Sequence, residues 1–189
     1  MIKALESKLA IHSPTGGNIR PVCATLEEPN DPRLQDTNSP GTSPKRFDLV
    51  ISHLVLHHIP SLSAMMKLMY GVLKPGGLIA LTDFENFGPE ARKFHPESKL
   101  DEVERHGIGK GEMESLIKDA GFVEVTVKEA FSMEKDVELD DVGPLGEKGQ
   151  MVFPFLICLG RKQGGDEKGN ETAGGDSAGA GWAPPVREL

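Results

Sequence analysis

Phe47-Asp-Leu-Val-Ile-Ser52 and Leu78-Ile-Ala-Leu-Thr-Asp83 are two short apolar runs, and each of them ends in polar residues. Between them, apolar side chains recur at helical spacing from Leu62 to Leu73, after Ser61 as a helix cap and before Pro75 and Gly76-Gly77 as a stop. Two apolar runs on either side of such a helix predict buried parallel strands joined by a crossover helix. This stretch therefore predicts an α/β fold.

Weaker patterns extend this unit in both directions. Downstream, a helix is expected over residues 112–120, a strand over 122–127 and a last strand over 151–160 with Pro154 near its start or at a bulge. Upstream, a helix over residues 1–10 and a weak edge strand over 19–26 are expected, the latter because Pro21 cannot donate to a central ladder. The irregular residues 86–106 are expected to hold short helices over the carboxyl edge of the sheet.

Two segments are too polar to bury themselves. Residues 27–45 are rich in Pro, Asn, Asp, Ser and Gly and predict a flexible surface loop, and residues 163–189 predict a disordered tail. The foldable domain is accordingly expected within residues 1–162.

Composition excludes several classes of protein. The 189 residues carry a net charge of −8, which disfavours a nucleic-acid partner because phosphate backbones need a basic stripe. No apolar run is long enough to predict a membrane span. Cys23 and Cys158, the only 2 cysteines, lie in apolar stretches and are expected to be buried thiols in a reducing compartment, so a cytoplasmic location is predicted.

Three landmarks in fixed order carry a family resemblance: the strand from Phe47, then Leu56-His57-His58, then Leu73-Lys-Pro-Gly-Gly77 leading into the strand that ends at Asp83. From Arg46 to Lys162 the chain resembles the class I S-adenosylmethionine-dependent methyltransferases. The resemblance implies an incomplete Rossmann-like α/β sheet, mostly parallel with an antiparallel last strand. It also implies S-adenosyl-L-methionine as cofactor and a small-molecule methyl acceptor as partner.

Candidate site residues follow the carboxyl ends of the two best strands, where ligands of open α/β sheets bind. They are expected to converge on one edge: Ser52, His53, His57, His58, Asp83 and Glu85. The resemblance assigns Ser52 and His53 to the methionine end of the cofactor. It assigns Glu27, or its neighbour Glu28, to the acid near the adenine. His57, His58 or Asp83 is the candidate catalytic base, and the alternative is that one histidine merely packs and caps the following turn.

A metal site is the other candidate, because the chain has 6 histidines. Adjacent histidines such as His57 and His58 rarely ligate one ion, and neither His-Glu-x-x-His nor Cys-x-x-Cys occurs. His95 and His106 lie in an irregular segment that is expected to cover the acceptor site instead. The sequence therefore predicts no metal site.

The family's Gly-rich Asp-x-Gly-x-Gly turn is absent from the printed sequence, and Gly16-Gly17 follows no strand. The expectation is a shortened family member that binds S-adenosylmethionine poorly and is inactive as given. The alternative is a noncatalytic remnant that pairs with another chain through an exposed sheet edge. A nucleotide-dependent dehydrogenase is disfavoured, because Gly-x-Gly-x-x-Gly is also absent.

Overall fold

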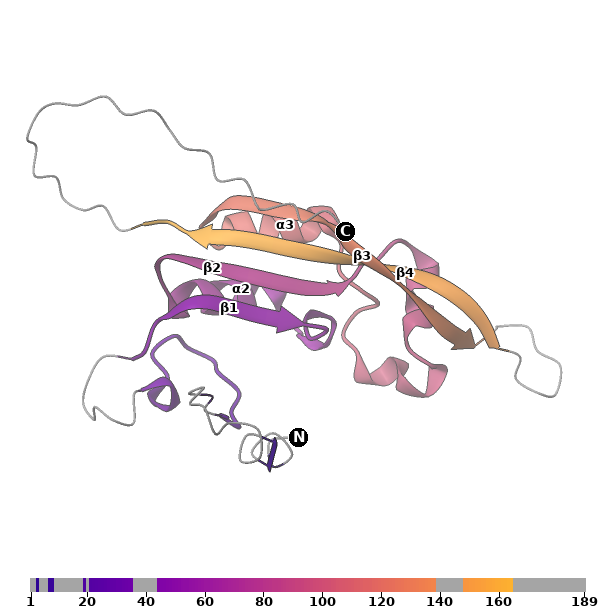
Figure 1. Ribbon diagram of the computed structural model, residues 1–189, viewed down its shortest axis with the longest axis horizontal. Helices are drawn as coiled ribbons and strands as arrows, with labels where there is room; N and C mark the ends of the chain where they lie inside the picture. Colours follow the sequence, from indigo (N-terminus) through magenta and orange to yellow (C-terminus); the bar gives the residue numbers. More distant parts are fainter. Residues whose placement is uncertain are drawn as a thin grey trace, which may run out of the picture.

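The computed structural model describes residues 3, 7, 8, 19, 21–35, 44–138 and 148–164. They form one mixed sheet with the strand order β1 (Phe47–His53), β2 (Leu73–Phe84), β4 (Lys148–Lys162) and β3 (Phe122–Glu138) (Figure 1). β1 and β2 are parallel, and β4 runs antiparallel to both of its neighbours, β2 and β3. Three strands therefore point the same way, which confirms the predicted mostly parallel sheet with an antiparallel last strand.

The pairing of β1 with β2 determines where their polar ends lie. Leu49 is paired with Leu78, and His53 is paired with Thr82. Because parallel strands in this register finish together, the residues that follow β1 and the residues that follow β2 share one edge of the sheet. The predicted strand–helix–strand unit is thus confirmed, with β2 starting directly after its helix.

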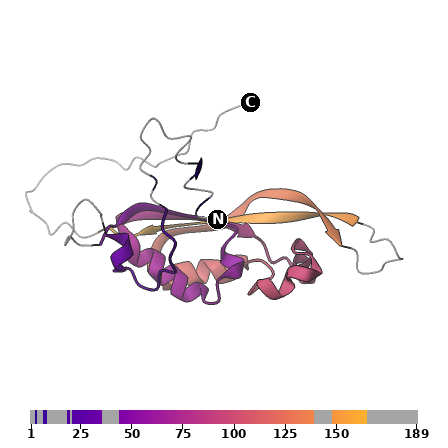
Figure 2. The same ribbon diagram turned by 90° about the horizontal axis from the view of Figure 1, so that it is seen from below.

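Two helices cover one face of the sheet (Figure 2). α2 (Leu62–Val72) is capped by the Ser61 side chain, which accepts a hydrogen bond of 3.2 Å from the amide of Ala64. α3 (Lys110–Asp119) lies beside it and buries Met113 and Ile117 completely. Each large side chain buried in this way stabilises the fold by about 1.5–3 kcal/mol, so this layer is the main core.

β3 and β4 are longer than the sequence predicted and extend as a hairpin beyond the ends of β1 and β2 (Figure 1). A second, aromatic cluster packs there, made of Phe84, Phe94, Val137, Phe153 and Phe155. Its Phe94 comes from the irregular segment after β2, which contains the short helices η3 (Pro89–Phe94) and η4 (Glu97–Glu102). A parallel bridge between Glu85 and Ile108 closes this segment at its base.

The strand predicted over residues 19–26 was wrong, since residues 21–27 are described without any strand pairing. Pro21 removes one ladder donor, and none of the described strands forms a ladder with this segment. Cys23 is consequently exposed, so only Cys158 is the buried thiol that the sequence predicted.

Other expectations fall partly outside the described residues. In the predicted loop over 27–45, residues 27–35 and 44–45 are described, and Asp31 caps the short helix η1 (Pro32–Leu34) through a 2.8 Å bond from the amide of Arg33. The predicted helix over residues 1–10 is described only at Lys3, Ser7 and Lys8, and the predicted tail only at residues 163 and 164. Among the described helices, none has the length and apolar character needed to cross a membrane.

The face of the sheet opposite α2 and α3 carries apolar side chains that the described residues leave accessible. Leu49 and Ile51 of β1 are 46% and 71% exposed, and Leu78 of β2 is 38% exposed. β1 is also the last strand of the described sheet on that side. The described sheet therefore presents an apolar face together with an unpaired strand edge.

Candidate functional site

The site is built around Asp83, the penultimate residue of β2. Its side chain is fully buried, and its Oδ1 accepts a 2.9 Å hydrogen bond from the amide of Phe84. The other bonds come from His57, whose Nδ1 lies 2.8 Å from Oδ1 and whose backbone amide donates to Oδ2 over 3.1 Å. A buried carboxylate requires such partners, because an unpaired charge away from water is very costly.

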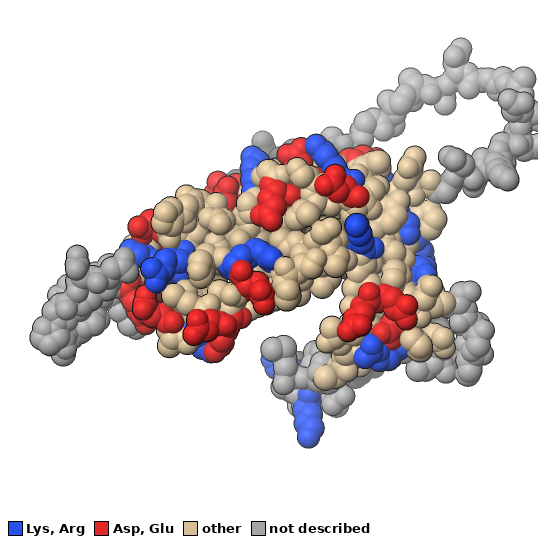
Figure 3. Space-filling model, turned by 180° about the vertical axis from the view of Figure 1, so that it is seen from behind, with Lys and Arg blue, Asp and Glu red and all other residues tan. Residues whose placement is uncertain are grey.

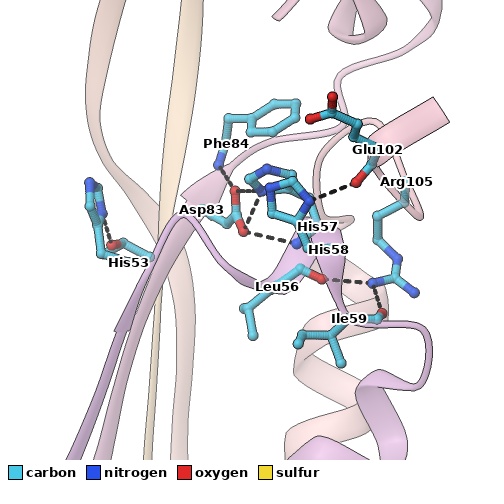
Figure 4. Close-up of polar contacts among 10 residues, drawn as sticks. His53, Leu56, His57, His58, Ile59, Asp83, Phe84, Glu102 and Arg105 are labelled. Carbon is cyan, nitrogen blue, oxygen red and sulfur yellow. Dashed lines mark hydrogen bonds and ion pairs between the residues drawn. The ribbon is translucent and has the colours of Figure 1, made fainter. Parts of the chain in front are cut away.

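His57 lies on η2 (Leu56–His58), the single helical turn that follows β1, and only 2% of it is exposed. A carboxylate can only accept hydrogen bonds, so Nδ1 of His57 carries the ring proton and donates the hydrogen bond to Asp83. This leaves Nε2 of His57 as a lone-pair nitrogen (Figure 4). Asp83 thereby determines both the tautomer and the orientation of the ring.

Two further histidines gather around this ring. The ring centroid of His58 lies 4.1 Å from that of His57, and the ring centroid of His95 lies 5.0 Å from it. Nδ1 of His58 lies 3.0 Å from the backbone oxygen of Glu102, so that nitrogen is also the protonated one (Figure 4). We call His57, His58 and His95 the histidine cluster. One ring nitrogen of each lies within 4.8 Å of a ring nitrogen of each of the other two.

His95 brings an unsatisfied polar atom to the histidine cluster. Its Nδ1 is buried and has no hydrogen-bond partner among the described residues. Burial, followed by the charges of His57 and Lys135, lowers the pKa of His95 to about 4. The imidazole of His95 is therefore neutral near pH 7 and offers a lone pair.

Hydrogen bonds from the segment after η4 hold η2, which we call the histidine turn, in position. The guanidinium of Arg105 donates to the backbone oxygens of Leu56 over 2.7 Å and Ile59 over 2.6 Å. The amides of Glu104 and Arg105 both donate to the backbone oxygen of His57. Gly107 follows with φ of 89°, and a Cβ there would lie 2.8 Å from the amide nitrogen of Asn86. Only glycine fits this close approach without strain.

Not all predicted site residues converge. His57, His58 and Asp83 do, as expected, but His53 lies on the opposite side of the strands, where its Nδ1 contacts Oγ1 of Thr82 at 2.6 Å (Figure 4). Successive strand residues face opposite ways, so Ser52 and His53 cannot both point toward His57. Glu85 is held by its amide, which donates to the oxygen of Pro154 over 2.8 Å.

Glu27 also stays apart from the histidine cluster. It is exposed in the unpaired segment 21–27, and no hydrogen bond or ion pair in the described structure joins it to His57, His58 or His95. Its assignment to the adenine end of the cofactor stays a prediction.

The contribution of His95 is the main feature that sequence reasoning missed. The sequence predicted no metal site from the adjacency of His57 and His58, whereas the fold brings a third histidine, His95, beside them from the segment after β2. The available signal was the placement of His95 in the segment expected to cover the edge.

Charge on the rear of the molecule is mixed. Lys and Arg side chains alternate there with Asp and Glu around a broad uncharged area (Figure 3). This view shows no continuous positive stripe among the described residues.

Comparisons with known proteins agree with the observed topology. Residues 21–81 match the model of a methyltransferase domain family, and no curated protein matches. An O-methyltransferase family protein from Burkholderia thailandensis shares the fold with a TM-score of 0.53 and 16% identity, over 87% of this chain and 41% of that one.

Two further structures are similar over shorter stretches. A SAM-dependent methyltransferase from Thermotoga maritima has 17% identity and a TM-score of 0.43, over 65% of this chain and 60% of that one. Phosphoethanolamine N-methyltransferase 2 from Haemonchus contortus has 13% identity and a TM-score of 0.41, over 62% of this chain and 34% of that one. The chain thus spans 60% or less of each of these three structures. Its described sheet and helices have the fold of the class I S-adenosylmethionine-dependent methyltransferases.

Proposed function

We propose that the chain serves S-adenosylmethionine-dependent methyl transfer to a small molecule, with the acceptor bound beside His57. The observation that carries the proposal is the buried pair of His57 and Asp83 at the shared carboxyl end of β1 and β2. That edge is where ligands of open α/β sheets bind. The methyltransferase family match over residues 21–81 includes β1, η2, α2 and most of β2.

The described residues fit the cofactor only in part. Ser52 and His53 end β1 at the expected position, but no Gly-rich turn after a strand occurs among the described residues, and the printed sequence has no Asp-x-Gly-x-Gly. Such glycines let a backbone approach a ligand closely. When bound, S-adenosylmethionine supplies a sulfonium methyl group. We therefore propose that this chain by itself binds the cofactor weakly.

The role of His57 is to take a proton from the acceptor. Its Nε2 has a free lone pair, and Asp83 stabilises the imidazolium that forms when this nitrogen is protonated. The acceptor heteroatom gains the methyl group and its proton moves to Nε2 of His57. The neighbouring ring of Phe84, edge-on to His57 at 5.1 Å, keeps water from one side of the imidazole.

The segment 86–106 is proposed to select the acceptor. It folds over the edge through Phe94, which stacks on Phe84 at 4.1 Å. Loops at this edge, held on a rigid sheet, are where specificity usually resides.

An NMR titration of the ¹⁵N-labelled chain with S-adenosylhomocysteine tests the proposal. We expect fast-exchange shifts at the amides of Ser52, His53 and His57, and a dissociation constant weaker than micromolar. The His57→Asn variant should show the same shifts at Ser52 and His53, because it retains β1. Shifts absent from this edge would refute the assigned function, and low-micromolar affinity would refute the proposed weakness of the isolated chain.

A noncatalytic partner-binding role is the second candidate, and the exposed β1 supports it. Leu49 and Ile51 are more apolar than a free edge strand ordinarily tolerates, since such edges pair with other chains. Between β1, α2 and residues 24–34 lies an apolar groove of about 540 Å³. Concentration-dependent protection of β1 amides from hydrogen exchange, together with no shift on adding S-adenosylhomocysteine, would favour this role over catalysis.

A further inference from the structure

We propose that His57, His58 and His95 form a binding site for a divalent transition-metal ion, of which Zn²⁺ is the expected example. One ring nitrogen from each histidine lies within 4.8 Å of the others. Three nitrogens around a tetrahedral Zn²⁺ at about 2.0–2.1 Å would lie closer together than this, so small side-chain rotations complete the site.

The hydrogen bonds of the two adjacent histidines leave the required nitrogens available. Nδ1 of His57 bonds to Asp83, and Nδ1 of His58 bonds to the backbone oxygen of Glu102. Nε2 of each ring therefore holds its lone pair, as a metal ligand must. Adjacency is no obstacle here, because η2 is a single helical turn that brings the two ring centroids to 4.1 Å, with an angle of 42° between the ring planes.

The same two bonds are typical of the surroundings of metal-binding histidines. A ligating imidazole almost always donates its other N–H to a carboxylate or a backbone carbonyl, which fixes the tautomer and raises ligand basicity. His57 has the buried carboxylate of Asp83 in this position, and His58 has the carbonyl of Glu102. A negative carboxylate next to the cluster also offsets part of the charge of a bound cation.

His95 supplies the independent reason to expect a ligand. Its Nδ1 is buried without a partner among the described residues, which is a costly state for a polar atom. A cavity of about 20 Å³ adjoins His95 near Arg92 and Glu97, so the ring has room to adjust. The positive charge of Lys135 repels a bound cation. Its ammonium, however, donates to the backbone oxygen of Phe94 and lies 4.2 Å from the centroid of the Phe94 ring.

The donor set indicates the class of ion. Imidazole nitrogens suit Zn²⁺, Cu²⁺, Ni²⁺ and Fe²⁺ rather than Mg²⁺ or Ca²⁺, which take oxygen ligands. Three protein ligands leave one position open for water or for an oxygen or nitrogen of a second ligand. If that second ligand is the methyl acceptor, a step that rests on the proposed function, the ion lowers the acceptor's pKa in place of Nε2 of His57.

Cobalt provides a probe that needs neither cofactor nor acceptor. The tag-free chain is titrated with Co²⁺ and then with Zn²⁺ in competition. We expect intense visible absorption typical of four- or five-coordinate Co²⁺, which Zn²⁺ abolishes at one equivalent. His58→Gln and His95→Gln should each lower the affinity for Zn²⁺ by about tenfold or more. Removing a residue that only hydrogen-bonds to a metal ligand already has an effect of about this size.

His53→Gln is the matched control, because His53 ends β1, the strand that precedes η2, and lies on the other face of the sheet. It should bind Co²⁺ with unchanged affinity and spectrum. His58 is exposed, so His58→Gln keeps the fold even if His95→Gln does not, and circular dichroism checks each variant. The proposal is overturned if the wild-type spectrum is that of octahedral Co²⁺, or if His58→Gln and His53→Gln bind equally well. Neither result bears on cofactor binding.

Discussion

Nδ1 of His57 lies 2.8 Å from Oδ1 of Asp83, although 26 residues separate them in the chain. The first residue belongs to the turn after β1 and the second to the end of β2, so this contact joins two elements that the sheet alone would only place side by side. Both residues are buried, at 2% and 0% exposure. The pair therefore orients the histidine turn relative to the sheet.

Asp83→Asn is expected to destabilise the protein by about 3 kcal/mol, the lower part of the range for breaking a buried pair. An amide cannot accept from Phe84 and from both His57 donors, so a buried polar group loses a partner. Urea unfolding followed by circular dichroism measures the change. Asp48→Asn is the control: its ion pair with Lys74 is exposed and screened by water, so we expect a much smaller shift of the midpoint. Equal midpoints for the two variants would contradict the structural role of Asp83.

Arg105→Lys should loosen the histidine turn without unfolding the sheet. The guanidinium donates to the carbonyls of Leu56, Ile59 and Pro60, and a lysine ammonium cannot reproduce that planar fork. We expect faster hydrogen exchange at the amides of His58 and Ile59, which mass spectrometry can follow. Arg92→Lys, which alters only an exposed pair with Glu97, should leave those amides unchanged. Unaltered exchange in Arg105→Lys would show that backbone bonds alone hold the turn.

The strands β1 and β2 could be predicted because the sequence pattern that identifies each of them lies within the strand itself. Buried parallel strands are short apolar runs, and both β1 and β2 have that signature within the run itself. The outer half of β3 could not be recognised, because residues 128–138 are mostly polar and become a strand through pairing with β4. The segment 21–27 shows the converse: an apolar run that pairs with none of the described strands stays irregular.

The site was only partly predictable for a related reason. Strand ends place His57 and Asp83 at one edge, and that argument needs no long-range information. The position of His95 depends on how η3 and η4 dock, which Phe94 and Arg105 decide through contacts distant in sequence. The divergence of His53 from Ser52, in contrast, follows from the pleat of a strand and could have been deduced.

The two thiols should differ sharply in reactivity. Cys23 is exposed, whereas Cys158 is fully buried, and burial together with the charge of Asp83 raises the pKa of Cys158 to about 12. Since the thiolate is the reactive form, we expect one fast thiol with Ellman's reagent at pH 8 and a second only in urea. Cys23→Ser should remove the fast phase and leave the urea-dependent one. Two fast thiols in folded protein would show that β4 is not packed as described.

Ile51→Lys should reduce self-association at little cost in stability. The side chain is 71% exposed on the open face of β1, and a charge on an edge strand opposes pairing with another chain. Because the lysine would remain in water, the free energy of unfolding should change by no more than about 0.5 kcal/mol. Sedimentation velocity at several concentrations measures the association. Ile79→Lys, at a position in β2 that is only 1% exposed, should instead unfold the chain. If Ile51→Lys is as destabilising as Ile79→Lys, that face is covered in solution, and the proposal of an accessible apolar edge fails.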